Sequence, residues 1–154
     1  VGQLRFDPMA MLPFCGYNMA DYFGHWLALG ANADADKLPR VFYVNWFRKD
    51  EDGRFMWPGY GENSRVLEWV FRRCDGDAEA HETPIGLVPH AGDLNIDGLD
   101  LDAATLDALI SVDESAVSAE LPQIEAHLAT FGDDLPDPVR AQFEALKERL
   151  GAAV

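Results

Sequence analysis

The first clear pattern in the chain is a stretch whose apolar residues follow the spacing of one helical face. Between residues 19 and 29 these residues stand at positions 19, 22, 23, 26, 27 and 29. Asn18, just before the stretch, is suited to accept a hydrogen bond from a first-turn amide, and Gly30 is suited to end the helix. We therefore expect a helix over residues 19–29, followed by a polar loop over residues 32–39.

A β-hairpin is expected next. Residues 41–47 (VFYVNWF) are β-branched and aromatic, which is typical of a buried strand. Asp52 and Gly53 provide turn chemistry, because glycine adopts positive φ at low cost. Residues 54–57 then form the returning strand. Residues 58–63 (PGYGEN) cannot continue it, since proline lacks an N–H donor and two glycines follow.

Helical spacing returns at residue 64, where apolar positions 66, 67, 70 and 71 share a face and Asn63 or Ser64 is the expected N-cap. The segment TPIGLVP from Thr83 predicts a short strand, and residues 103–109 predict a short helix. Two terminal packing helices are expected over residues 114–131 and 138–150, with Pro122 either kinking the first or marking its real beginning. The predicted class is mixed α/β, a hairpin plus helices.

Charge divides the chain unevenly. Residues 1–73 carry nine basic and nine acidic groups, whereas residues 74–154 carry three and eighteen, which accounts for the whole net charge of −15. An acidic half repels a phosphate backbone, so we expect no nucleic-acid partner. This half is either a solvated face or a docking surface for a basic partner. Any anionic ligand is expected on the first half.

The chain carries no membrane or export signal that we recognise. No apolar run approaches the roughly 20 residues that span a bilayer, and the first residues do not resemble a signal peptide. Cys15 and Cys74 are expected to be reduced thiols, which favours a cytoplasmic protein. Because the sequence opens on VGQLRFDP without an initiator Met, we expect a segment of something longer.

The chemistry-bearing stretch is NWFRKDEDGRFMWPGYGENSR, residues 45–65. The predicted hairpin brings Phe47 and Phe55 face to face, and a purine ring stacks on aromatic walls with about 1–3 kcal/mol per base. Asn63 offers both a donor and an acceptor to the edge of a base. The two glycines allow backbone to approach that edge closely. The alternative stays open that the rings are hairpin core and that Asn63 only caps the helix.

Four sequence motifs resemble those of a known family: DPMAMLPFCGYN, DYFGHWL, LPRVFYVNWFRKDEDGRFMWPGYGENSRVLEW and TPIGLVP. They resemble the C-terminal region of GTP-dependent phosphoenolpyruvate carboxykinases of actinobacterial type, in register from about Asp7 onward. The resemblance implies the C-terminal part of the carboxykinase nucleotide-binding domain. Residues 1–73 would be its guanine-pocket region and residues 74–154 its acidic helical packing region.

The resemblance also implies the site residues. The guanine base would be held by Phe47, Phe55, Tyr60 and Asn63, and the GTP-contact segment would be Tyr60, Gly61, Glu62 and Asn63. Tyr60 stands where the family usually has Phe, so its hydroxyl needs water or a polar partner if it is buried.

The implied reaction converts oxaloacetate and GTP to phosphoenolpyruvate, CO₂ and GDP, in gluconeogenesis or anaplerosis, with Mn²⁺ or Mg²⁺ assisting. The chain contains no G-x-x-x-x-G-K-S/T phosphate loop. The resemblance places the catalytic residues and metal ligands earlier in the full protein, so we expect none of either in this chain. The expected partners are GTP, oxaloacetate or phosphoenolpyruvate, and the missing N-terminal part of the same protein. The alternative function is a non-catalytic acidic interaction module.

Overall fold

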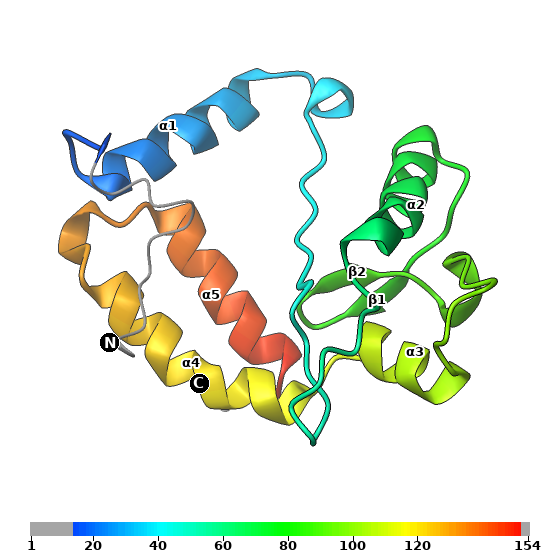
Figure 1. The fold of residues 1–154 in the computed structure, drawn as a ribbon. Coiled ribbons are helices and arrows are strands. Elements are labelled where there is room, and N and C mark those ends of the chain that lie inside the picture. Colours follow the sequence, from blue (N-terminus) through cyan, green and yellow to red (C-terminus); the bar gives the residue numbers. More distant parts are fainter. Residues whose placement is uncertain (1–13, 152–154) are drawn as a thin grey trace. The chain divides into compact units, whose positions relative to one another are not determined.

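The protein is described by a computed structural model that covers residues 14–151 (Figure 1), so the first part of the motif beginning at Asp7 lies outside the described residues. Five α-helices and one two-stranded antiparallel sheet occur in these residues, which confirms the mixed α/β class. The chain forms two compact units. One joins the residues up to Pro39 with those from Glu114 on, and the other is Arg40–Asp113. The functional division at residue 73 stays a prediction.

The first unit contains helix α1 (Met19–Asn32). Asn18 caps it as predicted, because its Oδ1 accepts a hydrogen bond of 2.9 Å from the Ala20 amide. The expected stop at Gly30 is wrong, since the helix continues to Asn32 and is capped by Ala33. Gly30 has helical backbone here, and glycine ends a helix only where the chain needs a left-handed residue.

Two further helices complete this unit, α4 (Glu114–Ala129) and α5 (Asp137–Arg149), which lie side by side (Figure 1). Helix α4 runs through Pro122, so Pro122 does not mark its beginning. Phe23 of α1 meets Phe131 edge-on, with ring centroids 5.5 Å apart. The buried residues of the unit are apolar: Ala20, Leu121, Leu135 and Phe143.

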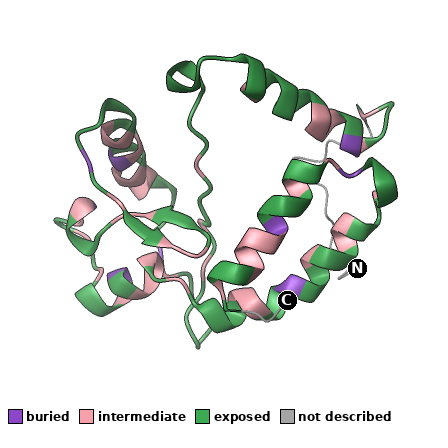
Figure 2. Cartoon of the chain, turned by 180° about the vertical axis from the view of Figure 1, so that it is seen from behind, coloured by how far each residue is buried: buried purple, intermediate pink, exposed green. Residues whose placement is uncertain are grey.

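The second unit packs helix α2 (Asn63–Asp75) and helix α3 (Ala103–Ile110) around a small core. Its buried members are Trp69, Ala78, Leu94 and Leu106. Helix α2 ends at Gly76, whose φ of 85° is the left-handed conformation that favours glycine. Buried positions are sparse along these helices (Figure 2).

The segment around Thr83 forms a hairpin instead of the single strand that we expected. Strand β1 (His81–Thr83) pairs antiparallel with strand β2 (Gly86–Val88). The two residues between them, Pro84 and Ile85, make the turn, and Gly86 follows with φ 136°. Proline suits a turn because its φ is already set and it has no N–H to leave unpaired.

The prediction of a buried strand over residues 41–47 is wrong. The segment has no strand structure, and Val41 and Tyr43 are 92% and 95% exposed. A strand needs a neighbour for its backbone groups, and the returning segment supplies only one bridge, Lys49 to Phe55. The returning strand over residues 54–57 is therefore also absent. High β-propensity alone does not make a strand without a partner.

No helix among residues 14–151 is both long and apolar enough to cross a membrane.

We predict that Leu106→Ala opens the core of the second unit. Leu106 is 4% exposed, and truncating a buried leucine typically costs about 2–5 kcal/mol. Hydrogen exchange of the amides in α2 and α3 measures the loss as a lower free energy of opening. The neighbouring exposed Asp107→Ala is the control and is expected to change that energy by less than about 0.5 kcal/mol. Equal effects of both variants would contradict the assigned core.

Candidate functional site

The tip of the predicted hairpin does form, although its strands do not. The Asp50 amide donates to the Arg54 carbonyl at 2.9 Å, and the Met56 amide donates to the Arg48 carbonyl at 3.0 Å. Gly53, with φ 78°, closes the turn by donating to the Asp50 carbonyl. The turn chemistry is thus confirmed, and it aligns the residues on either side of the turn.

This turn brings Phe47 and Phe55 together, as predicted. Their ring centroids lie 6.0 Å apart at an interplanar angle of 63°, an edge-on contact. The Asn45 side chain orients Phe47 by accepting a hydrogen bond from its amide, and the Lys49 ammonium lies 4.9 Å from the centre of the Phe55 ring. Both rings remain open, with Phe47 72% and Phe55 58% exposed. They are therefore not core residues of this unit.

Tyr60 is 91% exposed, and its ring contacts no other aromatic ring in the described part of the chain. It begins the 3₁₀ turn Tyr60–Glu62, which follows Gly59. Gly59 has φ 127° and ψ −174°, a combination that is essentially restricted to glycine. The Tyr60 hydroxyl is thus open to water, so the substitution of Tyr for Phe leaves no buried polar group here.

Asn63 does not cap helix α2, contrary to one of the two interpretations of its role. It is the first residue of the helix, with helical φ −61° and ψ −26°, whereas a capping residue adopts extended backbone. Its Oδ1 instead accepts a hydrogen bond of 2.9 Å from the indole nitrogen of Trp57. Trp57 is 7% exposed and packs near Trp46, with ring centroids 6.5 Å apart.

The Glu62 carboxylate is already engaged by Arg65, whose Nε lies 2.6 Å from Glu62 Oε2. The same guanidinium donates to the carbonyls of Asn95 and Asp97 at 2.8 and 3.1 Å. The Glu62 carboxylate and the Glu62 amide therefore both have partners within the chain. Gly61 is exposed and has open space around it. No sequence signal predicted the hydrogen bond of Trp57 to Asn63 or the bonds of Arg65 to the Asn95 and Asp97 carbonyls.

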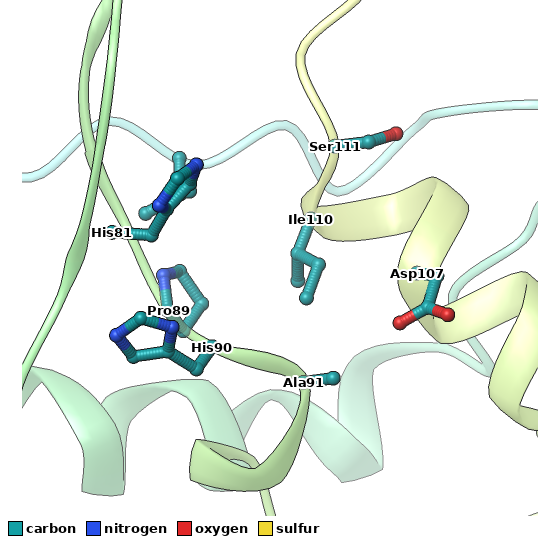
Figure 3. Close-up of a pocket in the computed structure, with 8 residues that line it drawn as sticks. His81, Pro89, His90, Ala91, Asp107, Ile110 and Ser111 are labelled. Carbon is teal, nitrogen blue, oxygen red and sulfur yellow. The ribbon is translucent and has the colours of Figure 1, made fainter.

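A separate cavity of about 300 Å³ contains none of the predicted site residues. It is lined by His81, Val88, Pro89, His90, Ala91, Asp107, Ile110 and Ser111. Figure 3 shows the two imidazoles together on one side and Asp107 on the other, and the imidazole ring centroids are 6.0 Å apart. Pairing of His81 with Val88 across the β-hairpin brings the histidines together, which sequence spacing did not reveal.

Comparison with known proteins identifies the family of this mixed α/β chain. A family model described as the phosphoenolpyruvate carboxykinase C-terminal P-loop domain matches residues 1–149. The chain therefore belongs to the GTP-dependent phosphoenolpyruvate carboxykinase family.

Three relatives illustrate the similarity, and each is named phosphoenolpyruvate carboxykinase (GTP). The protein from Neocallimastix frontalis is 53% identical over 99% of this chain and 25% of its own length. One from Treponema pallidum (strain Nichols) is 52% identical, with the same coverage. The one from Arthrobacter sp. (strain FB24) is 51% identical over 97% of this chain and 24% of its own length. The chain thus spans about a quarter of the length of the curated relatives it matches.

We predict that Gly59→Ala loosens the turn that leads into Asn63. Nothing lies within 4 Å of a Cβ added there, so the cost is backbone strain alone, about 1–3 kcal/mol. The Glu62 and Asn63 amides, which donate to the carbonyls of Gly59 and Tyr60, report it by faster hydrogen exchange.

Gly61→Ala is the matched control for this prediction. It also has open space, and its φ lies outside the positive region. Its exchange rates are therefore expected to stay near those of the unsubstituted protein. If both variants accelerated exchange equally, the strain at Gly59 would not be the cause.

Proposed function

We propose that this chain supplies the guanine-base pocket of a GTP-dependent phosphoenolpyruvate carboxykinase. The complete enzyme would convert oxaloacetate and GTP to phosphoenolpyruvate, CO₂ and GDP, in the cytoplasm and in gluconeogenesis or anaplerosis. Membership of the family supports the reaction. The base-binding role rests on the residues of the hairpin and of the start of helix α2.

The observation that carries the proposal is the exposure of the aromatic rings. Phe47, Phe55 and Tyr60 leave more than half of their surface open, although aromatic residues gain most from burial. Open ring faces are what a purine needs for stacking. The competing interpretation, that these rings form the hairpin core, does not fit such exposure.

Asn63 supplies the polar contact of the proposed pocket. It is half-buried, and its amide has both a donor end and an acceptor end. Guanine carries an acceptor at O6 beside a donor at N1, whereas adenine has the opposite arrangement at these positions. A buried group left unpaired by the wrong base costs about 1–3 kcal/mol, so one amide is enough to discriminate between them.

The phosphates and the metal are assigned to other parts of a full-length carboxykinase. Phosphoryl transfer needs a phosphate cradle and a divalent cation, Mn²⁺ or Mg²⁺ in this family. Residues 14–151 contain no group of three or more His, Cys, Asp or Glu side chains that would hold a metal ion. These residues form no site that fits the metal.

The rest of the enzyme would cover the exposed apolar surface. Val41 and Tyr43 carry β-forming side chains without a strand partner, and Phe71 on helix α2 is 68% exposed. Large apolar side chains that are left open in this way favour a surface that another part of a protein covers. We assign the N-terminal part of the same protein as the partner that packs there.

We predict that Asn63→Ala weakens discrimination between GTP and ATP in a full-length carboxykinase carrying this segment. The ratio of kcat/KM for GTP over ATP is expected to fall by about 5–150-fold, which corresponds to about 1–3 kcal/mol. Steady-state kinetics with both nucleotides measures it.

Asn32→Ala is the matched control for Asn63→Ala, because the Asn32 amide donates to the Ala28 carbonyl of its own helix. The nucleotide preference of this variant is expected to be unchanged. Equal affinity of the unsubstituted enzyme for GTP and ATP, seen by calorimetry, would refute the base-pocket proposal.

We further predict that the isolated 154-residue segment has no carboxykinase activity and little affinity for GTP. The reason is that the sequence has no phosphate loop and that residues 14–151 form no metal-ligating group, so only the base contacts remain, with stacking worth about 1–3 kcal/mol. Activity assays and calorimetry on the purified segment test this. Measurable turnover would contradict it.

A further inference from the structure

We propose that Trp57 is a positioning residue that sets which end of the Asn63 amide faces the nucleotide base. The inference rests on the proposed function of Asn63 as the base-contacting amide. Its basis is the hydrogen bond of 2.9 Å from Trp57 Nε1 to Asn63 Oδ1. Trp57 does not itself touch the base in this proposal and acts through Asn63.

The chemistry of the two groups leaves one orientation of the amide. An indole nitrogen is a donor only, so the atom of Asn63 that faces it must be the oxygen. Turning the amide by 180° would place two N–H groups against the indole N–H at 2.9 Å. That arrangement loses one hydrogen bond and sets donor against donor, in a place where Trp57 is almost fully buried.

Trp57 is well placed to impose this choice, because its own position is restrained. Its side chain is 7% exposed and packs near Trp46. The preceding residue, Met56, is tied to the Arg48 carbonyl by a 3.0 Å backbone hydrogen bond. The following residue is Pro58, whose ring restricts the backbone of Trp57 to extended conformations. The donor is therefore already in place before any ligand arrives.

The consequence is that Asn63 presents its Nδ2 donors to a ligand. Nδ2 forms no hydrogen bond within residues 14–151. The neighbouring polar groups are engaged elsewhere, because Glu62 and Arg65 form an ion pair. A group that only donates fits the 6-oxo group of guanine and opposes the 6-amino group of adenine. The indole thus occupies the oxygen of the amide and leaves only its donor end for the base.

A double-mutant cycle on a full-length carboxykinase carrying this segment tests the inference. The variants are Trp57→Phe, Asn63→Ala and the two combined, and the readout is the ratio of kcat/KM for GTP over ATP. Trp57→Phe keeps a buried aromatic ring but removes the N–H, so the amide is free to turn. We expect the ratio to fall by about three- to tenfold. In the Asn63→Ala background the same substitution is expected to have no effect.

Trp69→Phe is the matched control. Trp69 is 5% exposed, and its indole nitrogen is buried without a hydrogen bond in the described structure. It tests the loss of ring volume without the loss of a bond, and it is expected to leave the nucleotide preference unchanged. Should Trp57→Phe fail to fold, benzothienylalanine at position 57 keeps the bicyclic shape without the N–H and gives the same readout.

The outcomes separate the inference from the function on which it rests. No change of the ratio in Asn63→Ala would overturn the base-pocket proposal itself. A change in Asn63→Ala with none in Trp57→Phe would overturn only the positioning role of Trp57. Additive effects in the double variant would also overturn it, since Trp57 would then act independently of Asn63. A fall in Trp57→Phe that disappears in the Asn63→Ala background supports the inference.

Discussion

The hydrogen bond between the Trp57 indole and the Asn63 amide connects two elements that are otherwise built locally. The hairpin tip depends on its turn, and helix α2 depends on its own hydrogen bonds and on Trp69 in the core. The bond joins the residue that leaves the hairpin to the residue that opens the helix, across a turn through Gly59. The position of the Asn63 amide relative to the rings of the hairpin therefore depends on the hydrogen bond that the buried Trp57 indole donates to it.

Burial in the chain is uneven in a way that fits its proposed place in a larger enzyme. Each unit has a few buried apolar residues, and no polar or charged residue among positions 14–151 is buried. Many large apolar side chains are nevertheless exposed, among them Val41, Tyr43 and Phe71. Leaving such surface open to water is unfavourable unless something covers it. In the proposed function the nucleotide would cover the rings of Phe47, Phe55 and Tyr60.

The acidic second half of the chain does not bear directly on the proposed pocket. Most of its charged residues are exposed, and some form local ion pairs, such as the half-buried Lys147 with Glu144 at 2.7 Å. The hydrogen bond that Lys147 donates to the Glu144 carboxylate raises the pKa of Lys147 above its ordinary value. The exposure of most of these charges fits a solvated face, where ion pairs contribute little to stability. The residues of the proposed pocket lie in the first half of the chain, where basic and acidic groups are equal in number.

Local chemistry in the sequence was enough for the helices, for the Asn18 cap, for the turn at Gly53 and for the meeting of Phe47 with Phe55, because each depends on neighbours a few residues apart. The sequence motifs also identified the family. Tertiary structure decided the rest. Residues 41–47 have the composition of a strand but no neighbouring strand to pair with in the described structure. Asn63 could cap a helix or face a ligand, and only its helical backbone and the position of Trp57 exclude the cap. Both choices depend on which group lies opposite in space, and a linear sequence does not contain that information.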